Sequence, residues 1–94
     1  MSTEILHDPD ARRYTLRVDG NLIAALDYVE APTAVSFTHT FTSPVHRGKG
    51  FAAQVVEFAV DDVEASGNKR IVPMCWYVAQ WFDAHPERAG LLSR

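Results

Sequence analysis

The sequence lacks several features that would each point to a class of protein. It contains one cysteine and so cannot form an internal disulfide bond; this is compatible with a reducing compartment, and we expect a cytoplasmic location. No apolar run approaches the length that crosses a membrane, and residues 1–10 have no apolar segment like that of a signal peptide. The net charge of −3 argues against a nucleic-acid-binding domain, which is usually basic. We therefore expect neither a membrane nor a nucleic acid as a partner, and the oligomeric state is left open.

The histidines do not indicate a metal site. The chain has four of them, and none pairs with the single cysteine at a spacing typical of metal ligands. We expect no bound metal.

The length of 94 residues leaves room for one domain with one core, and we assign residues 1–94 to a single domain. Hydrophobic residues make up 47% of the chain and charged residues 22%, as in ordinary globular proteins. Residues 1–11 are mostly polar and are expected to form a loose lead-in.

Residues 13–42 show the period of two that is typical of strands. Apolar and polar positions alternate over residues 13–18, and Asp19-Gly20 favours a tight hairpin turn. Residues 21–30 are the predicted return strand, and residues 33–42 a third strand. One face of this third strand is expected to carry its larger side chains, Val35, Phe37, His39 and Phe41. We expect these strands to form an antiparallel three-strand meander.

The remainder of the chain has helical periodicity interrupted by a short strand. Apolar residues recur at helical spacing over residues 51–63, and Gly67-Asn68 marks the end of this helix. Residues 69–75 are predicted to form a strand, and residues 76–84 a second short helix. A β-α-β connection requires its two strands to be parallel. The predicted fold is α+β: a three-strand meander followed by a β-α-β unit and a short C-terminal helix.

The junction between the third strand and the first helix has the composition of a phosphate-binding site. Gly48 and Gly50 let the backbone approach a ligand closely, and Arg47 and Lys49 add two cationic side chains. The first N–H groups of the helix have no partner within it, and the helix dipole places partial positive charge there. A phosphate-bearing ligand suits this junction. The alternative is an ordinary glycine-containing helix start with solvated basic residues.

The same glycines fit the dinucleotide-binding pattern G-x-G-x-x-A, but the surrounding sequence disagrees with that interpretation. The preceding strand is rich in Thr and Ser rather than continuously apolar, and residues 70–75 offer no acidic residue for a ribose. The chain is also too short for a doubly wound sheet.

The segment Arg47–Ala52 also matches the pattern R-x-x-G-x-A, and here the chain resembles the GNAT superfamily of N-acetyltransferases. It is most similar to the minimal, single-domain branch of that superfamily, over roughly residues 13–92. The further shared features are His39-Thr40, Ser43-Pro44, Pro73-x-Cys75, Val78-Ala79 and His85-Pro86.

This resemblance implies a compact GNAT-like fold that binds acetyl-CoA as acetyl donor. The third and fourth predicted strands would separate after Phe41, with the pantetheine arm between them. Backbone near Phe41, Thr42 and Ser43 would bind that arm. The pyrophosphate would lie over Arg47, Gly48, Lys49, Gly50, Phe51 and Ala52.

Cys75 and His39 are the candidate catalytic residues. Cys75 lies at the end of the predicted fourth strand, where the resemblance places the thioester, and the helix that follows could lower its pKa. His39 could act as a general base. Each also has an ordinary structural interpretation, as a buried thiol and as a hydrogen-bonded core histidine. Tyr77 is interpreted as a core aromatic residue.

The resemblance predicts an N-acetyltransferase, with an amine attacking the thioester directly and a covalent acetyl-cysteine as the less usual route. Larger relatives often carry a glutamate base on the strand that here has no carboxylate over residues 33–43, so the base stays open. The acetyl acceptor is unknown, although an acidic chain favours cationic acceptors. The alternative is a non-catalytic acyl-CoA-binding or regulatory module, and a partner-binding domain ranks below it.

Overall fold

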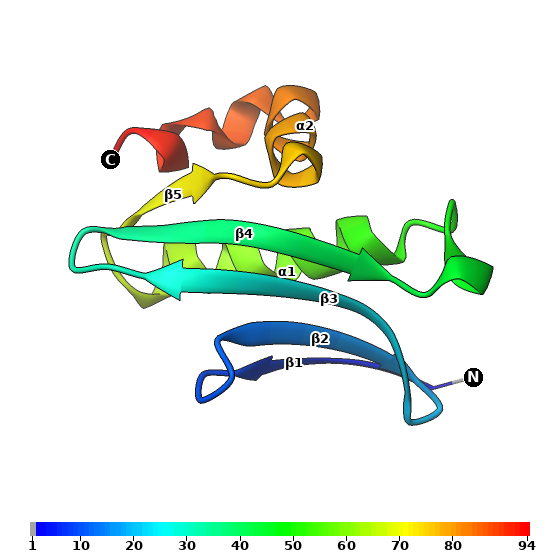
Figure 1. Ribbon diagram of the computed structural model, residues 1–94. Coiled ribbons are helices and arrows are strands. Elements are labelled where there is room, and N and C mark those ends of the chain that lie inside the picture. The colour runs from blue at the N-terminus through cyan, green and yellow to red at the C-terminus, as the bar shows by residue number, and fades with distance from the viewer. Residues whose placement is uncertain (1) are drawn as a thin grey trace.

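The computed structural model of the protein describes residues 2–94 and has an α+β fold (Figure 1). The elements in chain order are β1 (Thr3–Asp8), β2 (Arg13–Val18), β3 (Asn21–Glu30), β4 (Ala34–Thr42), the 3-10 helix η1 (Pro44–His46), α1 (Phe51–Ser66), β5 (Arg70–Pro73), α2 (Trp76–Ala84) and the 3-10 helix η2 (Pro86–Leu92).

The strands form one five-stranded sheet in the order β1-β2-β3-β4-β5. The first three pairs are antiparallel, whereas β4 and β5 are parallel and are connected through α1. Figure 1 shows α1 against one face of the sheet and α2 and η2 beside β5. The predicted meander and β-α-β unit are confirmed.

The predicted loose lead-in is wrong for residues 3–8, which form the edge strand β1. This strand pairs with β2 from Thr3↔Val18 to Asp8↔Arg13. Its side chains are exposed except for the partly buried Ile5, so no apolar alternation marks it in the sequence. Backbone pairing with β2 therefore defines this strand, and Met1 of the lead-in lies outside the described residues.

The turn between β2 and β3 has the predicted geometry. Asp19 and Gly20 have φ angles of 50° and 83°, the two positive values that a type I′ hairpin turn requires. The sequence Asp-Gly supplies them at low cost, because glycine has no Cβ and aspartate tolerates this region.

A β-bulge at Thr38 changes which side chains of β4 face the helix. Asp27 of β3 pairs with His39, whereas the next residue, Tyr28, pairs with Phe37, so Thr38 is the extra residue. Phe37 is fully buried under α1, but beyond the bulge His39 lies on the opposite face. The expected common face of Val35, Phe37, His39 and Phe41 is therefore wrong after Phe37, since one extra residue reverses the alternation.

The core lies between α1 and the sheet. The apolar stripe predicted for this helix is buried, and its members are Val55, Val56, Ala59, Val60 and Val63. It packs against fully buried side chains of the strands, including Leu16, Leu26, Phe37 and Ile71. This packing holds α1 across the sheet and so fixes the position of its N-terminus at the end of β4.

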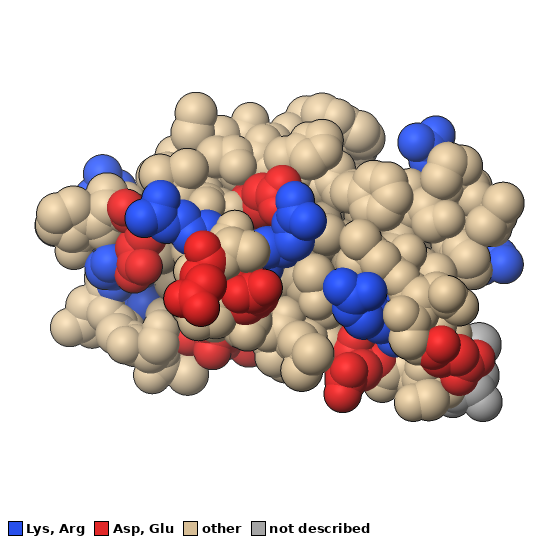
Figure 2. All heavy atoms as spheres, turned by 60° about the horizontal axis from the view of Figure 1, so that its bottom comes forward, with Lys and Arg blue, Asp and Glu red and all other residues tan. Residues whose placement is uncertain are grey.

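The surface carries no broad field of one sign on the face shown in Figure 2, where acidic and basic side chains are interspersed. Within residues 2–94, no helix combines the length and the apolar character needed to cross a membrane.

Candidate functional site

The parallel strands β4 and β5 separate after Phe37, not after Phe41 as the resemblance implied. Their last pair is Phe37↔Pro73, and β4 continues alone to Thr42. The N–H groups of Met74 and Cys75 both donate to the carbonyl of Phe37, each at 3.1 Å, and this turns the chain out of the sheet. The bulge at Thr38 follows directly. The strands therefore separate four residues earlier than expected, and the free edge of β4 is correspondingly longer.

An open cleft of about 770 Å³ lies along this free edge. Its three walls are the end of β4, the loop from η1 to α1, and the start of α2. The residues that line it are Thr38, His39, Thr40, Thr42, His46, Arg47, Gly48, Gly50, Phe51, Ala52, Met74, Cys75, Trp76 and Tyr77. The structure thus brings most of the predicted site residues into one cavity.

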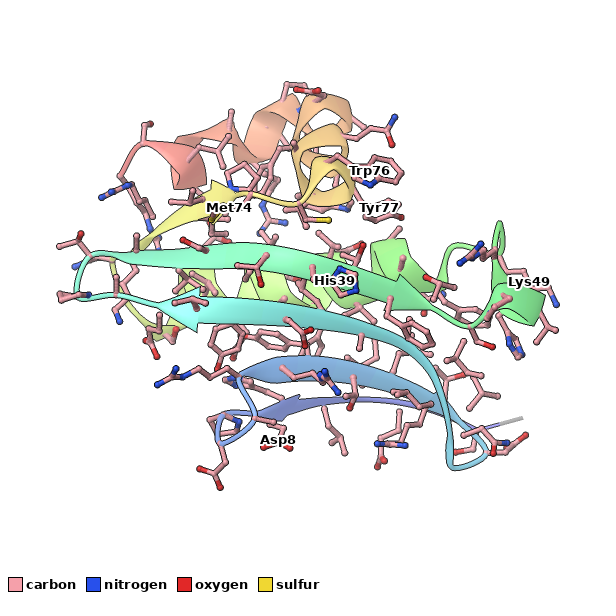
Figure 3. The ribbon with its side chains drawn as sticks, in the orientation of Figure 1. Asp8, His39, Lys49, Met74, Trp76 and Tyr77 are labelled. Carbon is pink, nitrogen blue, oxygen red and sulfur yellow. The ribbon has the colours of Figure 1, made fainter. Side chains whose placement is uncertain are left out.

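Three predicted site residues do not line the cleft. Phe41 lies on the opposite face of β4 and is 42% exposed. The N–H of Ser43 donates to the carbonyl of Ile23 at 2.7 Å, so this N–H is not available to a ligand. Figure 3 shows Lys49 at the outer end of the loop. Their predicted contacts with a ligand stay predictions, without support from this geometry.

The glycine loop presents open backbone at the N-terminus of α1. Gly48 and Gly50 have φ angles of 79° and 80°, and Gly50 is the N-cap of the helix. No side chain caps this end, and a Cβ built at either glycine would meet no atom within 4 Å. Gly50, Phe51 and Ala52 line the cleft, so the uncapped first turn of α1 borders open space, as an anion-binding helix start requires.

His46 lines the same cleft and was not predicted as a site residue. Its Nδ1 atom is buried without a hydrogen-bond partner among the described residues, and its ring lies 6.0 Å from that of Phe51 in a T-shaped arrangement. A buried polar atom without a partner requires an explanation, and a bound water, an ion or a catalytic role is among those that native structures show. In the sequence, the one signal that His46 belongs to the cleft is its position next to Arg47.

Cys75 is the N-cap residue of α2 and is half-buried at the edge of the cleft. Thr40 Oγ1 lies 3.6 Å from its Sγ atom. Burial by itself would raise the pKa of the Cys75 thiol, but this is outweighed by the Thr40 hydroxyl and by backbone N–H groups of Val78, Tyr77 and Thr40, and the pKa is lowered. These N–H groups are directed toward the sulfur without a complete capping hydrogen bond, so the hydroxyl of Thr40 is its principal partner.

Thr40 is the contact that the sequence did not reveal. Simple alternation places it on the solvent-facing side of the strand, away from Phe37, and the bulge returns it to the side of the helix. The one sequence signal was its place next to His39 in the family features.

His39 is not connected to Cys75 by a hydrogen bond. Within residues 2–94 its imidazole makes none, and it lies on the face of β4 that is opposite to α1 (Figure 3). It lines the cleft from there, at the free edge of the strand. The two candidate catalytic residues thus reach one cavity from different sides and do not form a pair.

Tyr77 lines the cleft on the first turn of α2, in addition to packing against the core. Burial raises the pKa of its hydroxyl, so this group holds its proton more firmly than an exposed tyrosine. Trp76 and Met74 flank Cys75 on the outside of the cleft and are 74% and 67% exposed (Figure 3). Chemically, the cleft combines an uncapped helix start, an open strand edge and a thiol whose pKa is lowered.

Comparison with known families finds a match over most of the chain. The model described as GCN5-related N-acetyl-transferase matches residues 13–91, which span most of the chain. The curated protein called Protein NATD1, from Gallus gallus, is 27% identical over 86 residues, covering 88% of this chain and 76% of the relative.

Solved structures with the same fold include two acetyltransferases. The ribosomal-protein-alanine N-acetyltransferase of Brucella melitensis biovar Abortus 2308 superposes with a TM-score of 0.58 and 27% identity, over 64% of this chain and 47% of that one. A predicted acetyltransferase of Clostridium acetobutylicum, solved with acetyl-CoA, superposes with a TM-score of 0.53 and 15% identity, over 78% of this chain and 55% of that one. The second likeness shows the fold alone, and the chain spans about half the length of either structure.

Proposed function

The chain belongs to the GCN5-related N-acetyltransferase family, and from this premise we propose that it transfers an acetyl group from acetyl-CoA to an amine. Family and fold are those of acyltransferases. The observation that carries the finer proposal is the cleft itself. It begins where β4 and β5 separate and ends at the uncapped N-terminus of α1.

The residues that line the cleft suit two parts of coenzyme A, the pyrophosphate and the pantetheine arm. Its pyrophosphate would lie on the first N–H groups of α1 above Gly48 and Gly50, with Arg47 as a neighbouring cation. Its pantetheine amides would bind the free edge of β4 beyond Phe37, in the way that an extended peptide adds to a sheet edge. The unpartnered His46 Nδ1 and the space above the glycines support this fit.

When bound, acetyl-CoA supplies the thioester carbonyl that the amine attacks. An N–C bond forms, the C–S bond breaks, and the amine gives up a proton. We assign that proton to Cys75, whose pKa is lowered by Thr40 and by the start of α2 after burial has raised it. Tyr77 is the proposed donor to the departing thiolate, because its side chain lines the cleft on the first turn of α2. His39 is retained as an alternative base at the free edge of β4.

The alternative function, a non-catalytic acyl-CoA-binding module, has one specific observation in its favour. Among the described residues, no hydrogen bond links Cys75 to a histidine or a carboxylate that could accept a relayed proton. Such a module would bind coenzyme A with the same loop and leave amines unchanged.

Incubation with acetyl-CoA and a panel of amines tests the proposal. The panel would contain a polyamine, an aminoglycoside, a lysine peptide and a peptide with a free N-terminal alanine, the last suggested by the name of the Brucella enzyme. Mass measurement should find at least one acetylated amine that depends on the protein. Tight binding of coenzyme A with no acetylated amine would favour the binding module.

A further inference from the structure

A second cavity of about 510 Å³ lies at the other end of the molecule and shares no lining residue with the cleft. It lies beside the C-terminal end of α1 and the turn between β3 and β4, which are at the same end of the sheet in Figure 1. Its volume is within the range of small-molecule sites, about 300–1,000 Å³. The acetyl-transfer proposal makes no use of it.

His7 forms one wall of this cavity, with Tyr14 and Tyr28 behind it, and hydrogen bonds hold the rings in place. The tyrosines are 2% and 7% exposed, so most of the exposed aromatic surface belongs to His7. His7 Nε2 and the Tyr28 hydroxyl are 2.6 Å apart, and the His7 ring stacks on that of Tyr14, with centroids 4.3 Å apart. The Tyr14 hydroxyl donates to Asp62 Oδ2 at 2.7 Å. This network ties β1, β2 and β3 to α1 and gives the wall a fixed shape.

The positively charged groups of the cavity are already engaged by the protein. The Lys69 ammonium lies 2.6 Å from Glu30 Oε2. The Arg94 guanidinium donates to the carbonyls of Lys69, Val63 and Gly67 at the end of α1. Neither cation is therefore free to serve as the main partner of an anionic ligand.

The carboxylate of Asp62, by contrast, still has one oxygen that can accept a hydrogen bond or face a cation. Asp62 Oδ1 makes no hydrogen bond with any residue from 2 to 94, and the nearest basic group is His7 Nδ1, 3.4 Å from the other carboxylate oxygen. The carbonyls of Val63 and Gly67 at the C-terminal end of α1 add nothing to this accepting capacity, because Arg94 already occupies them. Aromatic rings beside a carboxylate are the chemistry that recognises an organic cation.

We infer that this cavity binds a small organic cation, an ammonium with apolar substituents, with Asp62 as counter-ion and the His7 ring, backed by Tyr14 and Tyr28, against its substituents. The inference does not rest on acetyl transfer. A quaternary ammonium has no N–H bond and so cannot be an N-acetyl acceptor, which keeps the two sites separable in an experiment.

Titration followed by NMR of the ¹⁵N-labelled protein tests the inference, with choline as the probe. The matched control ligand is 3,3-dimethylbutan-1-ol, which has the same shape but a neutral carbon in place of the nitrogen. We expect choline to shift resonances around the cavity and to bind about tenfold more tightly than the neutral alcohol. Asp62→Asn should lose about tenfold in choline affinity, since the amide retains an acceptor for Tyr14 but not the charge. Asp61→Asn is the matched control: it removes the neighbouring carboxylate, which pairs with Arg88. Its choline affinity should stay within about twofold of wild type.

Three results would overturn the inference. They are equal affinities for choline and the neutral alcohol, choline-induced shifts confined to the cleft, and an unchanged choline affinity in Asp62→Asn. If Asp62→Asn does not fold, the comparison of the two ligands on wild type still decides.

Discussion

Cys75 lies where β5 ends and α2 begins, and its environment explains why a single thiol could do chemistry here. The boundary between strand and helix was predictable from periodicity, so its N-terminal position on α2 was predictable too. The contact with Thr40 was not, because it depends on the bulge at Thr38, and a bulge leaves no mark in the hydrophobic pattern. His39 was predicted on the same side as Phe37, and the same bulge moves it to the other.

Replacing Cys75 separates catalysis from packing. If the thiol takes part in the reaction, Cys75→Ala and Cys75→Ser should keep their affinity for coenzyme A and lose turnover by orders of magnitude, because only the transition state is affected. Calorimetry for affinity and a coenzyme A release assay for turnover measure the two effects. An unchanged rate in Cys75→Ala would remove the thiol from the mechanism and leave His39 as the candidate base.

The pH dependence of thiol reactivity tests the contact with Thr40. After the opposing effect of burial, the Thr40 hydroxyl is the largest cause that lowers the pKa of Cys75. Thr40→Val should therefore raise that pKa, so that the thiolate forms, and alkylation by iodoacetamide accelerates, at higher pH than in wild type.

Thr42→Val is the matched control, because Thr42 lines the same cleft and makes no side-chain hydrogen bond within the described residues. It should leave the alkylation profile where it is. Identical profiles for wild type and Thr40→Val would contradict the role given to the hydroxyl.

At the scale of elements, two features form the site. Strand β4 extends beyond its last pair with β5, and α1 begins without a side-chain cap. The first helix, its glycine loop and the parallel pair were all predictable, since apolar periodicity and glycine placement are local signals. The point of separation was not, because it is set by the hydrogen bonds of Met74 and Cys75 to Phe37, a contact between distant segments. The edge strand β1 was missed for a similar reason, since pairing rather than burial defines it.

Gly50→Val should abolish binding of coenzyme A in a folded protein. The residue has φ 80° and faces open space, so a valine costs about 1–2 kcal/mol of backbone strain and its side chain occupies the position proposed for the pyrophosphate. Calorimetric titration with coenzyme A measures the loss, with circular dichroism to confirm folding.

Gly20→Val is its matched control. Gly20 has φ 83° in the β2–β3 turn and does not line the cleft, and a valine there bears a similar strain. It should lower the melting temperature in a comparable way and still bind coenzyme A. Retained binding in Gly50→Val would exclude this loop as the phosphate site.

The two cations of the loop should differ, although the sequence alone suggested equal roles. Arg47 lines the cleft and Lys49 does not. Arg47→Gln should weaken coenzyme A by about tenfold and pantetheine, which lacks the phosphates, much less. Added salt should shrink that difference.

Lys49→Gln should change the affinities for coenzyme A and for pantetheine little, because Lys49 does not line the cleft. Equal losses for coenzyme A and pantetheine in Arg47→Gln would mean that the arginine acts through folding rather than through a phosphate contact.

For the whole molecule, the sequence was sufficient for the fold class and the family and insufficient for the substrate. A fold of this size follows from hydrophobic period, turn residues and one helix-start motif, each of which is local. The choice of acceptor depends on the shape and chemistry of the surface formed by Trp76, Met74 and the outer face of β4. These residues are distant in sequence or exposed, so no local pattern describes that surface. The second cavity was invisible for the same reason, since His7, Tyr28 and Asp62 are brought together only by the sheet and α1.

The most direct test of the central claim follows the acetyl group itself. Acetyl-CoA labelled with ¹³C in the acetyl group is incubated with the protein and the amine panel, and the labelled amide and the free coenzyme A thiol are both quantified. The account predicts equal amounts of the two products with at least one amine, and neither product above background with Gly50→Val. Thiol release without labelled amide, or labelled amide formed equally well by Gly50→Val, would contradict it.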